Sequence, residues 1–452
     1  MSFRRITILL TCLLVVGMGF GAPANAAKAR IGLVQAVGLS TSSITITWPK
    51  VAKAKKYQVV FATTFAMKNS TTKSAGKKRT YTIKGLKAGE NYCMFVRVSK
   101  GKSKGVRSAR YCKPTITQKG ATSGTKLTVM TYNVCSDKGR CGATWAQRQP
   151  AATELIASRA PDVVGVQEAN NDPYIGDGLA TKGYAQAIYS NAKALYYKTA
   201  TYEPTGNVGV QSCGDDINPW YDSYDPNLDD MYESDATATT DSTDRWYNSG
   251  SGDRVWKLKG PDANRADHNG EVGYAPNCAT GLVHMGSYNG DRYAVWAELR
   301  SKQTHKSFLF VSAHTTSGKG AKYDRQRLSE INNLIAQINA VNTKNLPVVY
   351  LGDFNSHKGR DLDGPGQAFK ANGYVDAFDN STSLIRPNYN SYNNFQSNPI
   401  TSYTYGDHVD HIYVKPTVGM STWESVANFS KKKYVGVIPS DHNPVRVTLT
   451  IR

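Results

Sequence analysis

The sequence predicts two folded units, a small all-β sandwich followed by a larger α+β domain. Short runs with alternating apolar residues recur at regular spacing between residues 31 and 116, which is typical of a β-sandwich. After residue 126, β-branched and apolar runs alternate with amphipathic helical segments, which indicates sheets covered by helices. A chain of 452 residues is long enough to hold both units.

Residues 1–26 have the features of a secretory signal. Arg4 and Arg5 precede the apolar run 6–20, and Ala24-Asn25-Ala26 is a small-x-small cleavage site. The alternative is an uncleaved anchor, but a run of about 15 apolar residues is short for a span of about 20. We therefore expect no stable membrane span and a secreted protein, either extracellular or associated with the cell envelope.

The first unit, residues 31–116, is predicted to be a basic β-sandwich. Its expected strands cover residues 43–48, 56–61, 79–83 and 92–98. Trp48 on the second strand, and Tyr92 at the start of an alternating strand, resemble the fibronectin type III pattern, with Tyr92 as the tyrosine corner. The small and polar residues at 117–125 predict a flexible linker.

The positive charge of the chain is concentrated in this first unit. Residues 27–126 contain 22 Lys and Arg against the single acid Glu90, whereas residues 127–452 hold 31 basic and 34 acidic residues. This excess favours binding of a polyanion, which could be nucleic acid, an anionic cell-wall polymer or an acidic membrane. Few aromatic residues lie between the lysines, so binding should be non-specific. The alternative is a solvated face without a partner.

Six cysteines remain after the signal segment, and an even number in an exported chain favours disulfides. Proximity in the sequence suggests the pairs Cys93 with Cys112, Cys135 with Cys141, and Cys213 with Cys278. Six cysteines allow about 15 pairings, so this assignment rests on proximity alone. A zinc site would need a CxxC or Cys/His spacing, which the sequence lacks.

The second unit, residues 126–452, is predicted to alternate strands with helices. Strands are expected at 127–130, 163–166, 308–311 and 348–351, and helices at 145–160 and 325–341. Each of the four strands is followed by a polar cluster. Strand ends are where α/β sheets present ligand-binding groups, so these clusters are expected to meet.

Five polar clusters carry the residue types that metal-assisted phosphodiester hydrolysis needs. They contain Asn133, Glu168, His314, the pair Asp353 and Asn355, and the pair Asp441 and His442. Each cluster alone could be an ordinary turn or loop. Their joint occurrence in this order, with Asp410 between the last two, favours a catalytic site.

Residues 126–452 resemble the endonuclease/exonuclease/phosphatase superfamily, the fold of the pancreatic-type deoxyribonucleases. The resemblance implies an α+β fold, a four-layer α/β/β/α sandwich of the deoxyribonuclease I-like type. It also implies a metal-dependent phosphoric diester hydrolase. Oxygen ligands suit Mg²⁺, and also Mn²⁺ or Ca²⁺. The implied ligands are Glu168 first, with Asn133 beside it and Asp441 completing the set.

The remaining residues receive roles from the same resemblance. His442, fixed by Asp410, would be the general base. Asp353 and Asn355 would orient the water and bind the scissile phosphate, and His314 would contact the phosphate or assist the leaving group. Arg292 matches a basic position that contacts phosphate.

A long acidic insertion at about 211–277 departs from the family pattern and leaves the substrate open. It holds 14 Asp and Glu against five Lys and Arg. A secreted nuclease acting on DNA, and also on RNA, is the first hypothesis. The alternative is a phospholipid phosphodiesterase of the sphingomyelinase type or a related phosphatase. The acidic insertion would be repelled by anionic bilayers, which favours the nuclease. A binding protein with a retired active site is the third hypothesis, and no core catalytic position is missing to support it.

Overall fold

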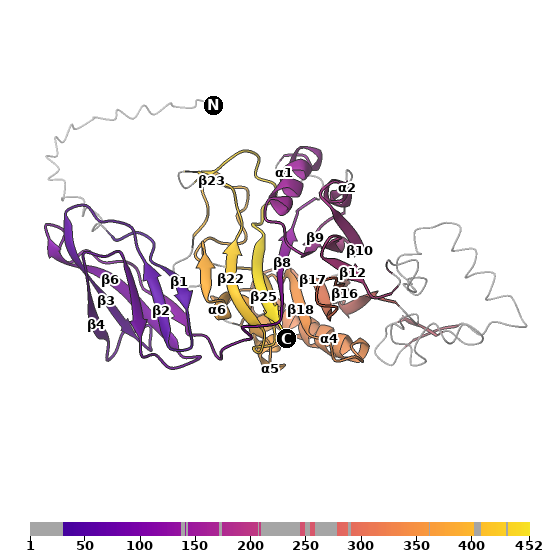
Figure 1. The fold of residues 1–452 in the computed structure, drawn as a ribbon, viewed down its shortest axis with the longest axis horizontal. Helices are drawn as coiled ribbons and strands as arrows, with labels where there is room; N and C mark the ends of the chain where they lie inside the picture. Colours follow the sequence, from indigo (N-terminus) through magenta and orange to yellow (C-terminus); the bar gives the residue numbers. More distant parts are fainter. Residues whose placement is uncertain are drawn as a thin grey trace, which may run out of the picture.

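The N-terminal unit is built from two β-sheets (Figure 1). Its strands are β1 (Gln35–Leu39), β2 (Ser43–Thr47), β3 (Ala54–Ala62), β4 (Thr71–Gly76), β5 (Thr80–Lys84), β6 (Asn91–Gly101) and β7 (Tyr111–Pro114). Strands β1, β2 and β5 pair in one sheet, and β4, β3, β6 and β7 in the other. Trp48 and Tyr57 are buried and meet edge to face. The hydroxyl of Tyr92 accepts a hydrogen bond from the N–H of Lys87 at 3.0 Å, which confirms the tyrosine corner.

Two mixed sheets form the centre of the second unit. The first contains β8 (Thr125–Asn133), β9 (Val163–Gln167), β10 (Tyr184–Ser190), β11 (Lys193–Lys198), β20 (Ser383–Ile385), β22 (Gly419–Ser425) and β25 (Val445–Ile451). The second contains β12 (Tyr202–Pro204), β15 (Thr280–Gly286), β16 (Arg292–Ser301), β17 (Ser307–His314), β18 (Val348–Asp353), β19 (Val375–Asp376) and β21 (Asp410–Val414). Two short pairs complete the strands: β13 (Arg245–Asn248) with β14 (Arg254–Lys257), and β23 (Phe429–Ser430) with β24 (Lys433–Tyr434).

Helices cover the outer face of each central sheet. Helices α1 (Trp145–Ala157) and α2 (Ile175–Ala180) pack against the first sheet, and α4 (Ala321–Val341) and α5 (Gly364–Ala371) against the second. The short α6 (Ala377–Asn380) follows β19. Helix α4 buries Ile331, Leu334 and Ile338, whose spacing of three and four residues places them on one face. A third apolar cluster fills the space between the sheets, so the four-layer sandwich predicted from the sequence is confirmed.

The structure is a computed structural model that describes residues 30–136, 141, 143–170, 174–206, 208, 278–287, 291–360, 362–401, 408–430 and 433–452, with the backbone of 245–248 and 254–257. The signal segment 1–26 lies outside the described residues, as does the insertion 211–277 with Cys213, apart from the backbone of those two short segments. Disulfides join Cys93 to Cys112 and Cys135 to Cys141, as predicted. Cys278 is also disulfide-bonded. In the described part of the chain, no helix is long and apolar enough to cross a membrane.

The two units share one sheet. Strand β1 pairs antiparallel with β20, so the first central sheet continues through β1 and β2 to β5 and has ten strands. The N–H of Leu39 donates to the carbonyl of Thr382 at 3.1 Å next to this pairing. Buried apolar residues of both units belong to one continuous cluster. The N-terminal unit is therefore packed onto the second unit and extends its sheet.

Residues 117–125 do not form the flexible linker that their composition predicted. The N–H of Ala121 donates to the carbonyl of Thr417 at 2.9 Å. A Cβ on Gly120 would lie 2.2 Å from the carbonyl oxygen of Val418, so glycine is required by close backbone contact and not by flexibility. The segment lies against the turn before β22, and its small residues permit this approach.

A buried lysine also joins the two units. Lys113 on β7 has no solvent exposure, and its Nζ donates to the carbonyl of Phe378 and to Oδ1 of Asp379, each at 2.8 Å. The same Nζ lies 3.0 Å from the centre of the Phe378 ring. Lys358 of the second unit forms an ion pair with the other oxygen of Asp379. Asp379 is thus neutralised from both sides of the junction.

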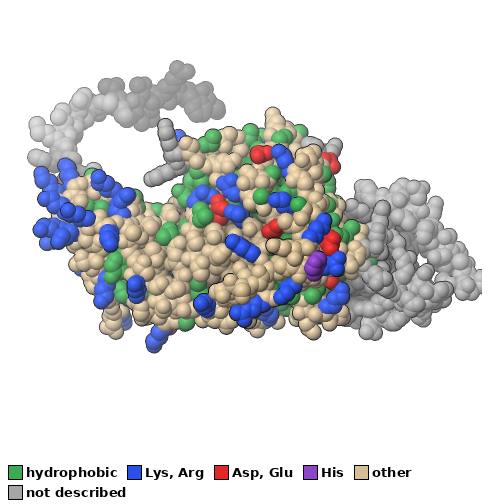
Figure 2. Space-filling view, in the orientation of Figure 1, with side chains coloured by type: hydrophobic (Ala, Val, Ile, Leu, Met, Phe, Trp, Pro, Cys, Tyr) green, Lys and Arg blue, Asp and Glu red, His purple; other side chains and the backbone are tan. Residues whose placement is uncertain are grey.

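Lys and Arg side chains gather at one end of the molecule, over the N-terminal unit, at the upper left of Figure 2. This agrees with the charge distribution of the sequence, in which 22 of the basic residues lie between residues 27 and 126.

Candidate active site

Three of the expected site residues are aligned by the second central sheet. His314 ends β17, Asp353 ends β18, and Asp410 begins β21. In the register of this sheet, His314 lies opposite Asp353 on a parallel neighbour, and Asp353 lies opposite Asp410 on an antiparallel one. Strand pairing alone therefore brings these side chains to one edge.

The first central sheet supplies the other half of the cluster at the same edge. Asn133 ends β8, and Glu168 follows the parallel neighbour β9. His442 lies three residues before β25, and the first residue of that strand pairs with Thr131 near the end of β8. The hydroxyl of Ser440 donates to the carbonyl of Asn133 at 2.7 Å, which fixes the segment carrying His442 to the end of β8.

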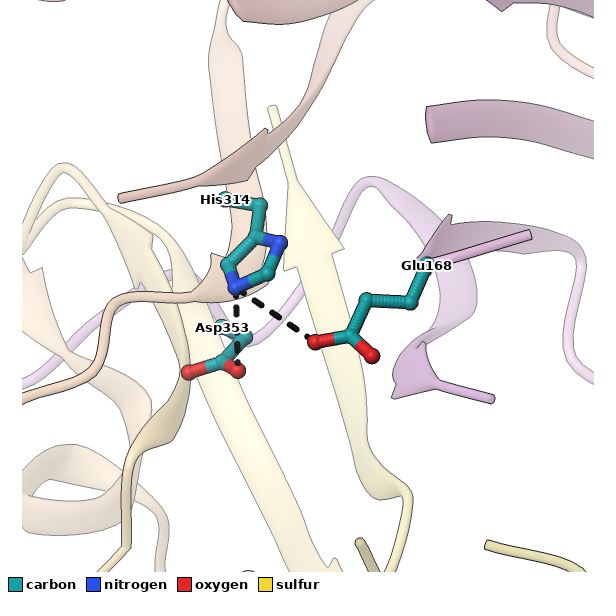
Figure 3. Close-up of side chains that lie close together, drawn as sticks. All are labelled: Glu168, His314 and Asp353. Carbon is teal, nitrogen blue, oxygen red and sulfur yellow. Dashed lines mark ion pairs between the residues drawn. The ribbon is translucent and has the colours of Figure 1, made fainter. Parts of the chain in front are cut away.

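Glu168 holds a backbone conformation that few side chains adopt. Its φ is +54°, and the left-handed region costs a residue with a Cβ about 1–2 kcal/mol. Neighbouring bonds maintain it, because the carbonyl of Glu168 accepts from the N–H of Ser136 at 3.0 Å, and the N–H of Ala169 donates to Ala192 at 3.0 Å. The turn directs the carboxylate toward His314 and Asp353 (Figure 3). Strain of this kind is concentrated at functional sites.

Asn133 bridges the two carboxylates of the cluster. Its Nδ2 donates to Oε1 of Glu168 at 2.9 Å and to Oδ2 of Asp353 at 3.0 Å. Its Oδ1 accepts from the N–H of Cys135 at 3.0 Å. The amide therefore presents its nitrogen to the carboxylates, and its side-chain oxygen would reach a cation bound there only after the amide turned over.

His442 and Asp410 form a buried pair. Nδ1 of His442 lies 2.8 Å from Oδ2 of Asp410, and Nε2 faces Oδ2 of Asp353 at 3.8 Å. The hydroxyl of Ser391 accepts from the N–H of Asp410 at 3.1 Å and holds the start of β21. Burial lowers the pKa of His442, but the carboxylates of Asp410 and Asp353 outweigh it and raise this pKa well above its ordinary value. The orientation leaves Nε2 as the nitrogen that can exchange a proton in the site.

Asp353 is almost fully buried and shares the site with both histidines. Burial raises its pKa to about 7, and His442 acts in the opposite direction. Nε2 of His314 lies 3.5 Å from Asp353 and 3.8 Å from Glu168 (Figure 3). Burial, then Arg292, lowers the pKa of His314 well below its ordinary value. The surroundings therefore shift the pKa values of the two histidines in opposite directions, upward for His442 and downward for His314.

Comparison with known proteins places this geometry in a family. Residues 130–442 match the model of the endonuclease/exonuclease/phosphatase family, and residues 29–111 match the fibronectin type III domain. The chain belongs to the endonuclease/exonuclease/phosphatase family. No curated protein matches the sequence.

Several solved structures of low sequence identity are similar to this chain. One is an endonuclease/exonuclease/phosphatase family protein from Bacteroides thetaiotaomicron, 19% identical, with a TM-score of 0.46 over 72% of this chain and 98% of that chain. A mannosyl-6-phosphatase from the same organism is 18% identical, with a TM-score of 0.46 over 72% and 100%. TDP2 from D. rerio, complexed with single-stranded DNA product, is 12% identical, with a TM-score of 0.42 over 72% and 100%.

A buried lysine at the site, Lys193, was not singled out from the sequence. Lys193 begins β11 and is only 6% exposed, and its Nζ donates to the carbonyl of Asn191 at 2.5 Å. Burial, with Arg292 nearby, lowers the pKa of Lys193 to about 7. Arg292, at the start of β16, has a buried Nε without a hydrogen-bond partner among the described residues. No motif marks Lys193, which begins the strand Lys193–Lys198.

The remaining predicted residues lie at the margin of the cluster. Asn355 also has a left-handed backbone, with φ of +48°; its N–H donates to Oδ1 of Asp353 at 2.9 Å and its Nδ2 to the carbonyl of Thr315 at 3.1 Å. It therefore holds Asp353 in place. Asp441 is half-buried, and its backbone carbonyl accepts from Asn393 at 2.6 Å. Its carboxylate is near the hydroxyl of Ser440, at 3.4 Å.

Two groups of side chains among the described residues could each hold one metal ion. One consists of Glu168, His314 and Asp353, and the other of Asp353, Asp410 and His442, with ligand atoms within 4.8 Å of one another in each. The first group offers two carboxylates, which suit a hard divalent cation. Asp441, predicted as a ligand, belongs to neither group.

His411, the neighbour of Asp410, faces away from the site. Its Nδ1 lies 3.0 Å from Oδ2 of Asp376, and its Nε2 lies 3.0 Å from the carbonyl of Ser356. Burial lowers the pKa of His411, but Asp376 raises it to about 9. This second histidine–aspartate pair joins β21 to β19 beneath the site.

Proposed function

We propose that this chain is a secreted, metal-dependent phosphodiesterase that hydrolyses DNA. The observation that carries the proposal is the arrangement of one edge of the fold, where a buried His442–Asp410 pair faces the carboxylate of Asp353, and His314 faces the carboxylates of Asp353 and Glu168. Family membership supports a hydrolase of phosphate esters. The 22 basic residues between residues 27 and 126 support a long polyanionic substrate over a small phosphate ester.

His442 is the proposed general base. Its Nδ1 is held by Asp410, so Nε2 is the nitrogen that takes the proton of the attacking water. The two nearby carboxylates stabilise the resulting imidazolium, which is why they raise the pKa of His442. The ring must be neutral before it can act, so turnover is expected to increase toward alkaline pH.

The other side chains bind and orient the phosphodiester. Neutral His314 can donate from Nε2 to a phosphoryl oxygen or to the leaving oxygen. Lys193 and Arg292 place positive charge beside His314 and Glu168 and would offset the charge of the phosphate. Asn355 keeps Asp353 aligned through its backbone N–H.

Glu168 and Asp353 are the proposed ligands of the divalent cation, and their oxygen donors suit Mg²⁺. A cation of this kind offsets negative charge on the phosphoryl oxygens and lowers the pKa of bound water. The donor set fits, because Asn133 holds the two carboxylates side by side and both face the histidines.

Substrate class and metal dependence are tested together. The purified protein would be incubated with supercoiled plasmid, RNA, sphingomyelin and a phosphate monoester, in Mg²⁺, in EDTA, and after Mg²⁺ is restored. We expect plasmid cleavage that stops in EDTA and returns with Mg²⁺. Hydrolysis of sphingomyelin or the monoester without plasmid cleavage would reject the nuclease, and full activity in EDTA would reject the metal.

Export is proposed from the signal-like residues 1–26 and is supported by the two disulfides among the described cysteines. Expression in a secreting host and intact-mass measurement of the protein in the medium tests it. The expected mature chain starts at Ala27. Retention of Met1 in a cell-bound product would contradict the proposal.

A further inference from the structure

The cations of the fibronectin type III domain are concentrated along one edge of that domain. We define the basic edge as residues 50–56, 77–79 and 100–104, three segments that hold ten Lys and Arg, all exposed. The opposite edge has three exposed lysines, Lys68, Lys84 and Lys87, together with Glu90, the only acid of the domain. Glu90 precedes the 11-residue β6 and residues 100–104 lie at its far end, so Glu90 is about 35 Å from the basic edge.

The segments of the basic edge are tied together although they repel each other. The hydroxyl of Ser103 donates to the carbonyl of Ala52 at 2.6 Å, and a Cβ on Gly101 would lie 2.3 Å from the carbonyl oxygen of Lys53. Lys56 and Lys100 are directly opposite in the β3–β6 register. Like charges in such a pair destabilise a sheet. Within the described residues, no lysine of the basic edge forms an ion pair, so this concentration of charge does not serve stability.

The basic edge and the active site lie on the same edge of the ten-stranded sheet. Strand β8 ends at the site. The pairing registers show that β22, β20 and β2 end at the same edge of the sheet as β8, whereas β25, β1 and β5 begin at that edge. Residues 50–56 follow β2, and residues 77–79 precede β5. Both segments therefore leave the sheet on the side on which Asn133 and His442 reach the site. This edge is uppermost in Figure 1, and in the same orientation the cations of Figure 2 are at the upper left.

The spacing between the two surfaces follows from the strand order. Five inter-strand steps separate β8 from β2, which corresponds to about 24 Å at about 4.8 Å per step. The second sheet of the sandwich, which carries residues 100–104, is stacked about 10 Å from the first in the perpendicular direction. The two displacements combine to about 26 Å, which equals about eight base pairs of duplex DNA, at about 3.4 Å each.

The distance is maintained because the junction is rigid. Strand pairing between β1 and β20, the buried contact of Lys113 with Asp379, and the close packing of Gly120 on Val418 hold the domain in one orientation. A domain on a flexible tether would only raise the local concentration of substrate. A domain fixed in this way can contact the substrate at a defined distance from the reacting bond.

We propose that the basic edge is a second contact surface for duplex DNA, which binds backbone phosphates about eight base pairs from the bond that is cleaved. The proposal rests on the proposed nuclease function and adds to it a minimum substrate length. A duplex of about eight base pairs that is cleaved near its middle reaches the active site but not the basic edge. Duplexes of about 30 base pairs reach both.

The test compares two triple variants with equal loss of charge. Lys53→Gln/Lys102→Gln/Lys104→Gln alters the basic edge, and Lys68→Gln/Lys84→Gln/Lys87→Gln alters the opposite edge. Binding of the full-length proteins to duplexes of about 8 and about 30 base pairs would be measured in EDTA across a series of KCl concentrations. We expect the first variant to lower the salt slope for the long duplex by up to about 3, since each lost phosphate contact removes about 0.9. The short duplex should bind all three proteins alike, and the control variant should match wild type.

Each other outcome overturns the proposal. Equal slopes for wild type and the first variant would mean that the basic edge does not contact DNA. Equal losses in both variants would mean that general charge attracts DNA without a defined surface. Binding to phosphatidylglycerol vesicles, measured in parallel, would assign the edge to a membrane if only vesicle binding depended on it. Plasmid cleavage by wild type is recorded separately, so failure of the nuclease assignment is distinguishable from failure of this contact.

Discussion

Glu168 and His442 are held by their surroundings in states that they would not adopt alone. The backbone of Glu168 is left-handed, and the ring of His442 lies between two buried carboxylates. Both arrangements cost free energy and both aim a reactive group into the site. Substitutions at these two residues can therefore separate the proposed chemistry from folding.

Replacement of His442 tests the base directly. His442→Ala should lower kcat by at least about 10², because general-base catalysis contributes about 10²–10⁴. Steady-state cleavage of a short duplex, with a thermal melt of each protein, provides the measurement. His305→Asn, at an exposed turn with φ of +55°, is the matched control and should retain wild-type turnover. A folded His442→Ala protein with normal kcat would reject the assigned role.

Backbone strain at Glu168 can be isolated by two substitutions that both remove the carboxylate. Glu168→Gly should be more stable than Glu168→Ala by about 1 kcal/mol, since only the alanine keeps the left-handed penalty. Both variants should be inactive. Urea unfolding of the pair gives the difference, and equal stabilities would show that the backbone relaxes at no cost.

Sequence patterns located four of the five polar clusters of the site because each of these four follows an apolar strand. Glu168 and Asp353 are found in this way. Lys193 was not, because in the sequence a lysine at the start of a strand looks like any solvated position, and its burial depends on the neighbouring sheet. The orientation of the Asn133 amide could not be predicted from the sequence either, because it is set by the hydrogen bond from the N–H of Cys135.

At the scale of elements, the pair of His411 on β21 and Asp376 on β19 couples stability to pH. The pKa of His411 rises from its ordinary value of about 6.5 to about 9, chiefly through Asp376, with Asp363 contributing, against the effect of burial. The protonated ring therefore stabilises the fold fully below about pH 6.5, and this contribution is lost as pH rises through about 9. The shift corresponds to on the order of 3 kcal/mol.

The measurement is a set of urea midpoints for wild type and His411→Gln at pH values from about 6 to 10. The free energy of unfolding should fall across this window in wild type. The fall should be smaller in the variant, by on the order of 3 kcal/mol. Asp376 has a lowered pKa because His411 outweighs burial, so its own contribution would disappear only under acidic conditions. Parallel curves for the two proteins between pH 6.5 and 9 would contradict the coupling.

Long elements were predictable and short ones were not. The expected helix at 145–160 ends at Ala157 in the structure, because Ala160 is left-handed and Pro161 disfavours helix before it. The three-residue β20 has no periodicity of its own, and its partner β1 is distant in the sequence. Composition marked 117–125 as flexible, but small residues also permit tight packing, and here they do.

At the scale of the whole molecule, Lys113 joins two domains that sequence analysis treated as separate. Lys113→Met should lower the free energy of unfolding by about 3 kcal/mol, because removing one partner of a buried ion pair leaves the other group incompletely paired. Lys119→Met, at an exposed position, is the control and should change little. Thermal melts should show the loss in the domain containing Asp379, and an unchanged melt would mean that the junction does not couple the domains.

The junction also has a consequence for the order in which the chain acquires its structure. Lys113 and Phe378 are 265 residues apart, and contacts of such separation form late because loop closure precedes them. The N-terminal sandwich has its own disulfide and can be complete while the rest of the chain is still being made. Until β20 emerges and pairs with it, β1 is an open edge strand. β20 is likewise an open edge strand until the two domains pack together. Each domain thus covers an open strand edge of the other, and a newly made chain is most vulnerable in the interval before they meet.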